Sequence, residues 1–447
     1  MSGVLVLGRS LPALAAALEF AEVGIGVTIA SSSPRLPQGE VRDASGDVAR
    51  LLEDVAAPIA DGVGANPEAA PVRSHPAPVL LAAKQGALRR PPAPAVWGIP
   101  TAALSADSIA FLGTRAALRV YLDRLKPVLT IGKQENLAKL ISARIGSSAL
   151  QLLVEPLVFE RLGVSASEAE VSVVAPGLDE AITRAGTLTG GAAWLLDVHL
   201  EREALVEPAA GWADFGERLL ARLALYGAEL IEPEAEGDDP EVLEAGAEEA
   251  LADWDRADFD AIIVDAGAAS EIDPAGELGF DAEFAHDLAA LSPARVRVYA
   301  EIGIESPASP SEAGQAGFLR LVPSRRGEVW AVRAMPDRDG RWIARLSGPS
   351  AVADEFDAVV ARAVVAEVLG ELSLEASGEP RVHLSAAPYA TRAQRAERET
   401  MLDAWHESHP DAIACGEELH GDSLGLAIAD ARRRAIELRR RILGIAE

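Results

Sequence analysis

The residues that come closest to a recognisable chemistry stand at the start of the chain. The apolar run Val4–Leu7 is followed by Gly8-Arg9-Ser10-Leu11-Pro12-Ala13 and then by small and apolar residues. A strand, a glycine turn and a helix in this order typically hold the pyrophosphate of a dinucleotide, with the pattern G-x-G-x-x-G. Gly8 keeps the first glycine and Ala13 suits the third, but Ser10 puts a side chain where the second glycine lets the backbone approach phosphate.

The second half of the same unit also follows the dinucleotide-binding pattern only in part. Val27–Ala30 is a second apolar run, at the distance from the first strand that a βαβ unit requires. The acidic residue that would follow it and bind a ribose hydroxyl is replaced by Ser31, a weaker hydrogen-bonding partner. We therefore expect a Rossmann-like unit whose contacts to a dinucleotide are weakened.

Residue types that commonly act as nucleophiles or metal ligands form no convincing site in this sequence. The catalytic residues are unknown, because no G-x-S-x-G motif marks a nucleophile and Cys415, the single cysteine, is interpreted as a small buried residue. His406 and His409 have a spacing compatible with metal binding, but the polar stretch before Pro410 favours a helix end. We predict no metal site.

The composition excludes several classes of partner. The chain has 447 residues and a formal net charge of −28 at pH 7, which disfavours nucleic acid and anionic membrane surfaces. No apolar run is long enough to cross a bilayer, so no transmembrane span is expected. A single cysteine fits a reducing compartment, and we expect a cytoplasmic protein.

The distribution of apolar residues predicts an α/β protein with more than one core. Strand-like patterns disappear between Leu104 and Leu188, where apolar residues recur at helical spacing, and alternation after Val296 indicates an antiparallel sheet. We expect a discontinuous Rossmann-like domain (residues 1–95, 200–270 and 400–447), a helical subdomain (residues 96–199) and a mixed or antiparallel sheet domain (residues 271–399).

Motifs along nearly the whole chain resemble those of a known family. They are Trp97-Gly98-Ile99-Pro100, Leu152-Leu153-Val154-Glu155-Pro156-Leu157, Ala387-Pro388-Tyr389 and Cys415-Gly416-Glu417. In this order they resemble the G-[VI]-P turn, the L-V-x-P-L segment, the A-x-P-Q-Y signature and the closing flavin motif of the flavin-dependent protoporphyrinogen and coproporphyrinogen oxidases. This family of haem biosynthesis lies within the flavin amine oxidase superfamily. The resemblance implies a flavoprotein in which the Rossmann-like domain binds FAD and the sheet domain binds substrate.

The departures from the family pattern gather where FAD would be held. The resemblance assigns cofactor binding to Gly8, Ser10, Ala13, Ser31, Arg35, Gly416, Glu417 and Ile428. The family's R-x-G-G is Arg35-Leu36-Pro37-Gln38 here, and Glu417 adds a carboxylate near the expected pyrophosphate. We therefore expect that FAD binds weakly or has been lost.

The resemblance also implies a flat tetrapyrrole as the substrate, with the flavin performing the oxidation. Because the guanidinium group matches carboxylates with two parallel hydrogen bonds, arginines near the sheet are candidates to bind the propionates. These are Arg320, Arg333 and Arg345, with Arg381 beside them, and the alternative for each is a solvent-facing position on the sheet. An apolar slot lined by Leu152, Val154, Leu157 and Phe159 would suit the macrocycle.

Two functions from different classes follow. The first is an oxidoreductase of the protoporphyrinogen oxidase type, which oxidises a porphyrinogen with FAD and oxygen. The alternative is a non-catalytic homologue that keeps the fold and binds a porphyrin or a partner protein. A divergent amine or carotenoid oxidase is a third possibility on fold alone. Besides the tetrapyrrole, a protein partner or a second copy of the chain is the kind of partner we expect.

Overall fold

The computed structural model describes residues 3–30, 34–60, 63–126, 135–231, 258–267, 282–307, 316–337, 339–352 and 358–445. They form two compact and discontinuous units. Unit 1 comprises Met1–His75, Arg202–Pro293 and Glu397–Glu447, and unit 2 comprises Pro76–Glu201 and Ala294–Ala396. The finer division of unit 2 into a helical and a sheet subdomain stays a prediction. No helix in the described ranges is long and apolar enough to cross a membrane.

Unit 1 is built on a parallel sheet of five strands in the order β10-β2-β1-β11-β17. In chain order these are the third, second, first, fourth and fifth strands, which is the arrangement of dinucleotide-binding folds. The predicted α/β class is thereby confirmed. The strands are β1 (Gly3–Leu7), β2 (Gly26–Ala30), β10 (Glu229–Ile231), β11 (Ala261–Asp265) and β17 (Ala412–Cys415).

Helices cover both faces of this sheet, as strands that are apolar on both sides require. Val4 and Val6 of β1 pack on one face, and Leu5 and Leu7 pack on the other. The first face carries α1 (Leu11–Ala21), α2 (Asp47–Ala56), α11 (Trp212–Leu225) and α17 (Leu424–Ile442), and the second carries α14 (Ala282–Ala290) and α16 (Arg392–Ser408). A small antiparallel sheet of β3 (Val41–Arg42), β9 (Leu205–Pro208) and β4 (Pro71–Ser74), with the 3₁₀ turn η1 (Pro67–Ala69), completes the unit.

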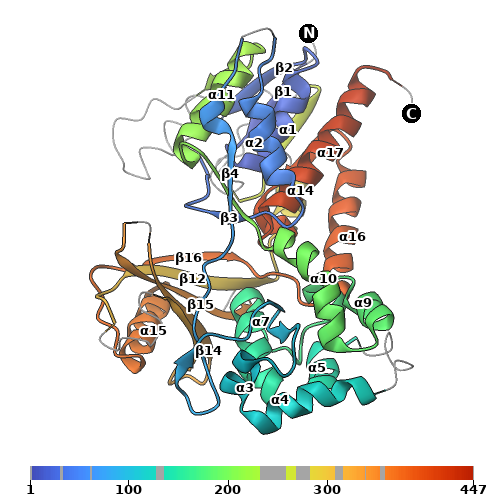
Figure 1. Ribbon diagram of the computed structural model, residues 1–447. Coiled ribbons are helices and arrows are strands. Elements are labelled where there is room, and N and C mark those ends of the chain that lie inside the picture. Colours follow the sequence, from blue (N-terminus) through green and yellow to red (C-terminus); the bar gives the residue numbers. More distant parts are fainter. Residues whose placement is uncertain are drawn as a thin grey trace. The chain divides into compact units, whose positions relative to one another are not determined.

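The first and last helices of unit 1 lie side by side (Figure 1). Every residue of α1 is buried, including Glu19. Its carboxylate is held by Arg432 and Arg439 of α17, each at 2.8 Å. The chain ends are therefore joined by charged contacts as well as by apolar packing.

Unit 2 contains an antiparallel sheet of five strands in the order β13-β14-β15-β12-β16, as the alternation predicted. One face packs on the helical segment of unit 2 through α7 (Glu155–Leu162), and the other packs on α15. The strands are β12 (Arg295–Gly303), β13 (Phe318–Pro323), β14 (Val329–Pro336), β15 (Trp342–Val352) and β16 (Arg381–Ala386), and α15 spans Ala358–Glu371.

The rest of unit 2 is mainly helical, and its helices share one apolar core. The helices are α3 (Ala106–Leu112), α4 (Thr114–Tyr121), α5 (Leu137–Ile145), α6 (Ser147–Ala149), α7 (Glu155–Leu162), α8 (Val171–Val174), α9 (Leu178–Ala185) and α10 (Leu188–Arg202), with a 3₁₀ turn η2 (Leu122–Leu125) and a π turn η4 (Leu150–Val154). Two small hairpins precede them, β5 (Leu81–Ala82) with β6 (Leu88–Arg89) and β7 (Ala95–Val96) with β8 (Ile99–Pro100).

Candidate functional site

The carboxyl ends of three neighbouring strands in unit 1 each lead into a glycine. Gly8 follows β1, Gly267 lies just beyond β11, and Gly416 follows β17. Because these strands are parallel neighbours, the glycines lie at one edge of the sheet, where β1 and β11 form the switch point at which such folds bind ligands. We call residues 8–10, 265–267 and 415–418 the cradle. Gly8 has φ of 107°, a conformation that favours glycine.

Asp265, the last residue of β11, fills the centre of the cradle. Its side chain is buried, with 1% exposure, and one carboxylate oxygen accepts the Ser10 N–H at 3.2 Å. The other oxygen accepts the Gly267 N–H at 3.3 Å. A Cβ placed on Gly8 would collide with the Cβ of Asp265 and would lie 3.0 Å from Oδ2. The space beside Gly8 is therefore already occupied by the chain itself.

Glu418 and Arg35 cover the other two glycines. A Cβ on Gly416 would lie 2.7 Å from Oε1 of Glu418, which belongs to the 3₁₀ turn η7 (Glu417–His420). A Cβ on Gly267 would collide with both Nη1 of Arg35 and Oε1 of Glu418. The backbone of Arg35 also runs beside the β1–α1 loop and donates its N–H to the Arg9 carbonyl at 3.4 Å. All three glycines thus face charged side chains of the same chain.

Burial raises the pKa of both carboxyl groups of the cradle, and repulsion by Asp265 adds to the effect at Glu418. Burial raises the pKa of Asp265, against the lowering effects of hydrogen bonds from Ser10 and of the charge on Arg35. Burial and the neighbouring Asp265 raise the pKa of Glu418 to about 7, although Arg35 and Arg398 act in the opposite direction. Near neutral pH, Glu418 is therefore poised between its charged and uncharged forms.

The structure brings together only some of the residues to which the sequence assigned cofactor binding. Gly8, Ser10, Arg35 and Gly416 lie in or beside the cradle, whereas Ala13 and Ile428 are buried in the helical core of unit 1. Glu417 begins η7, but the carboxylate that approaches Gly416 belongs to the next residue, Glu418. Ser31 lies outside the described residues. Whether these residues bind a cofactor stays a prediction.

Asp265 and Glu418 were missed by the sequence analysis. A signal for Asp265 was present, since an acidic residue directly after the apolar run of β11 must lie at the carboxyl edge of a parallel sheet. No comparable signal marked Glu418 over Glu417, because the orientation of each side chain depends on the turn after β17.

The three predicted substrate arginines do not face the same way. Arg333 and Arg345 are register partners in β14 and β15, so they share one face of the sheet, whereas Arg320 pairs with Val332 and faces α15. Arg333 is held by Glu160 of α7 through contacts of 2.5 and 2.7 Å, and this ion pair raises its pKa against the effect of burial. Arg345 pairs with Glu301 at 2.9 Å but keeps 49% of its side chain exposed.

An aromatic pair lies on the same face as Arg345. Tyr299 of β12 and His383 of β16 are register partners whose rings stack at 5.5 Å between centroids with an interplanar angle of 18°. Two residues along, Glu301 lies between Arg345 and Arg381, and it accepts hydrogen bonds from both. We call Tyr299, Glu301, Arg345, Arg381 and His383 the sheet face. It combines flat aromatic surface with exposed guanidinium groups.

The four residues predicted to line an apolar slot belong instead to the core of unit 2. Val154 and Phe159 are buried, at 0% and 7% exposure, and Leu152 and Leu157 pack against the same cluster. Their apolar character is explained by the packing of α7 and its neighbours.

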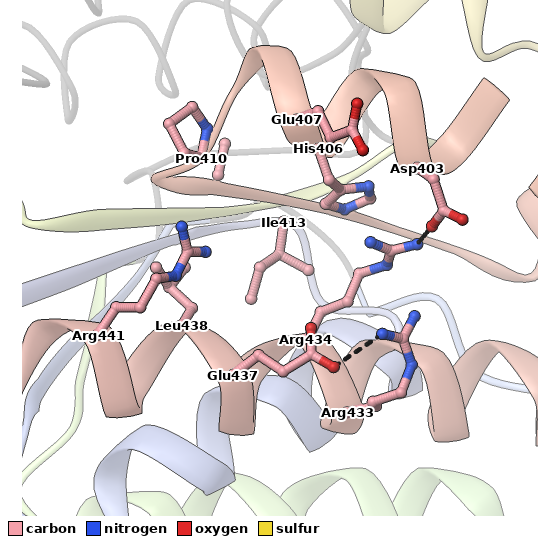
Figure 2. A pocket seen from close by; sticks show the side chains of 11 residues that line it. Asp403, His406, Glu407, Pro410, Ile413, Arg433, Arg434, Glu437, Leu438 and Arg441 are labelled. Carbon is pink, nitrogen blue, oxygen red and sulfur yellow. Dashed lines mark hydrogen bonds and ion pairs between the residues drawn. The ribbon is translucent and has the colours of Figure 1, made fainter. Parts of the chain in front are cut away.

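Apart from the cradle, unit 1 has a polar cavity of about 460 Å³ between α16, β17 and α17 (Figure 2). Two of its arginines are held by carboxylates, since Arg434 binds Asp403 at 2.8 Å and Arg433 binds Glu437 at 2.9 Å, and Glu407 and Arg441 also line the cavity. His406 accepts the Ala414 N–H through Nε2 and therefore donates from Nδ1 to the Leu402 carbonyl. Burial lowers the pKa of His406 to about 4, so it is neutral at pH 7.

Metal binding finds no support around His406 and His409. Both rings bond to carbonyls one turn earlier in α16, at 2.6 Å from Leu402 and 2.9 Å from Trp405. Among the residues that the structure describes, no three His, Cys, Asp or Glu side chains gather as metal ligands would. Cys415 is buried, and burial raises its thiol pKa, so it is not poised as a nucleophile.

Comparison with known proteins defines the fold. No family model matches the sequence, and no curated protein matches it. Among solved structures, a fatty acid isomerase from P. acnes is similar over 97% of both chains, with 11% identity and a TM-score of 0.50. The chain therefore shares the fold of this isomerase over nearly its whole length.

A second solved structure is more similar to this chain. A candidate protoporphyrinogen oxidase from Exiguobacterium sp. 255-15 covers 98% of this chain and 99% of its own, with 16% identity and a TM-score of 0.61. The resemblance predicted from the motifs is confirmed at the level of the fold.

The cradle as it stands does not fit the pyrophosphate of FAD. Pyrophosphate needs free backbone N–H groups and close approach to the glycine turn, and it favours positive surroundings. Here Asp265 already accepts the Ser10 and Gly267 N–H groups, and Glu418 adds a second carboxyl group beside Gly416. An FAD molecule would have to displace these side chains to bind in the manner of related folds.

Proposed function

We propose that this chain is a cytoplasmic, porphyrinogen-oxidase-like protein that binds a tetrapyrrole bearing carboxylate side chains and does not oxidise it. The observation that carries the proposal is the sheet face of unit 2, where the stacked Tyr299 and His383 lie beside exposed Arg345 and Arg381. A flat macrocycle stacks on aromatic rings, and its propionates pair with guanidinium groups.

The spacing on the sheet face suits such a ligand. Residues two apart on one strand lie about 7 Å apart on the same face, so the aromatic pair and the arginines are close neighbours. Arg345 and Arg381 share the single carboxylate of Glu301, and their side chains are 49% and 70% exposed. A propionate can therefore pair with one of these arginines while Glu301 stays paired with the other.

The oxidase reaction predicted from the motifs is the alternative. The likeness of the fold to the candidate protoporphyrinogen oxidase supports it. It requires FAD, and the filled cradle argues against FAD binding with the affinity that turnover needs. We therefore favour the non-catalytic homologue.

The decisive assay supplies coproporphyrinogen III and protoporphyrinogen IX, with and without added FAD, and follows porphyrin fluorescence. A parallel titration with the oxidised porphyrins measures binding through their absorbance. We expect binding without turnover. Turnover that depends on added FAD would establish the oxidase instead, and failure to bind either oxidised porphyrin would refute the tetrapyrrole proposal.

A substitution on the sheet face should weaken porphyrin binding selectively. Arg345→Ala removes one exposed cation, and we expect the dissociation constant for coproporphyrin to rise about tenfold, as for the loss of one charge-assisted hydrogen-bonded pair. Arg320→Ala is the matched control, because Arg320 faces α15 on the opposite side of the same sheet. Equal effects of the two substitutions would contradict the assignment of this face.

A further inference from the structure

The cradle of unit 1 keeps the geometry of a phosphate site but contains its own anion. The helix α1 has 11 residues and no acidic residue in its first turn, so its N-terminus favours a negative charge from elsewhere. Asp265 accepts the N–H of Ser10, the residue that precedes the helix, and this hydrogen bond and the charge on Arg35 favour its ionised form against the effect of burial. The Gly267 N–H donates to the same carboxylate, so both strand ends at the switch point are tied to one group.

The neighbouring charges complete the arrangement. Arg35 and Glu418 meet over Gly267, and Arg35 lowers the pKa of both carboxyl groups. A cation that would otherwise be available for phosphate therefore already faces two acidic side chains. A pyrophosphate entering this edge would have to break the two hydrogen bonds of Asp265 and lie beside Glu418.

We infer that Asp265 is a built-in replacement for the phosphate of a dinucleotide, so that unit 1 is stable without any cofactor. The position follows from the fold, since the switch point between β1 and β11 is where a dinucleotide binds in such sheets. The inference concerns unit 1 alone and does not depend on the tetrapyrrole proposed for unit 2, so the two can fail separately.

The test compares the wild-type protein with Asp265→Asn and Asp265→Ala by thermal unfolding and by quenching of FAD fluorescence. We expect about 1 mM FAD or inorganic pyrophosphate to leave the wild-type midpoint unchanged. Without ligand, Asp265→Ala should unfold about 3–6 °C lower, because two N–H groups and the helix end lose their acceptor. Both ligands should restore part of that loss, and FAD should bind the variant at least about tenfold more tightly than the wild type.

Asp265→Asn keeps an acceptor of the same shape and removes the charge, so it should fold even if the alanine variant does not, and it should show the same gain in FAD binding. Glu399→Gln, at an exposed position of α16, is the control and should behave as the wild type. The inference is overturned if the wild type binds FAD as tightly as Asp265→Asn. It is also overturned if Asp265→Ala is as stable as the wild type, or if neither FAD nor pyrophosphate stabilises either Asp265 variant.

Discussion

Replacing Glu418 with glutamine should make the protein more stable at pH 8 by about 2–3 kcal/mol and should leave its stability at pH 4 nearly unchanged. Burial and the adjacent Asp265 raise the pKa of Glu418 from 4.5 to about 7 in the folded state. In the unfolded chain the same group has its ordinary pKa. The folded state therefore holds a proton that the unfolded chain has already released.

The sign of the pH dependence follows from that difference. The contribution of Glu418 is fully present below pH 4.5 and is lost as the pH rises through about 7, because the group then ionises in a buried position beside Asp265. Glutamine has no charge to develop, so the variant avoids this loss. Other titrating groups act equally in both proteins and cancel in the comparison.

Urea unfolding at several pH values between 4 and 8 measures the effect directly. The difference in unfolding free energy between variant and wild type should grow with pH and level off above about 7. Glu399→Gln removes an exposed carboxylate of the same unit and should show no such growth. A difference that is constant with pH would mean that Glu418 titrates normally and that the cradle is more open to water than the structure indicates.

The sequence was sufficient to predict helices and strands wherever the apolar residues follow one regular spacing. The apolar run of β1, the glycine after it and the small residues of α1 are a local pattern, and the alternation after Val296 is another. Such local patterns could not give the sheet order, because β11 pairs with β1 from more than 200 residues away in sequence and β17 then pairs with β11. The sequence analysis therefore predicted the domain but not the order of its strands.

The candidate site was less predictable because it depends on register and on distant contacts. Arg320, Arg333 and Arg345 look equivalent in sequence, yet the pairing of β13 with β14 puts Arg320 on the other face. A shift of one residue in that register would exchange the faces. The contact between Ser10 and Asp265 likewise joins positions 255 residues apart, so no local pattern in the sequence predicts it.

Arg297→Ala should be the most damaging single substitution in unit 2, lowering the free energy of unfolding by about 3–5 kcal/mol. The alternation of β12 makes Arg297 look like an exposed strand residue, but it is only 1% exposed. Its guanidinium donates to the Gly348 carbonyl of β15 at 2.6 Å and to the Glu160 and Phe159 carbonyls at 2.7 and 2.9 Å.

These contacts place a positive charge at the C-terminal end of α7, where the last carbonyls lack partners within the helix. Arg297 thereby connects the sheet with the helical segment, in addition to the ion pair between Arg333 and Glu160. Removing the side chain takes a charged donor away from three carbonyls, of which Phe159 keeps the Gly163 N–H, and opens a cavity. Lysine should not restore stability, because a single ammonium group cannot reproduce the fork that reaches three acceptors on two elements.

Arg295→Ala is the matched control, since Arg295 begins the same strand and is exposed, and it should cost less than about 1 kcal/mol. Urea unfolding followed by circular dichroism gives both values. Because the Arg297 guanidinium also lies 5.2 Å from the centre of the Tyr299 ring, Arg297→Ala should weaken porphyrin binding as well. A variant that is as stable as Arg295→Ala would show that α7 is held to the sheet without Arg297, and that the sheet face does not need Arg297 for support.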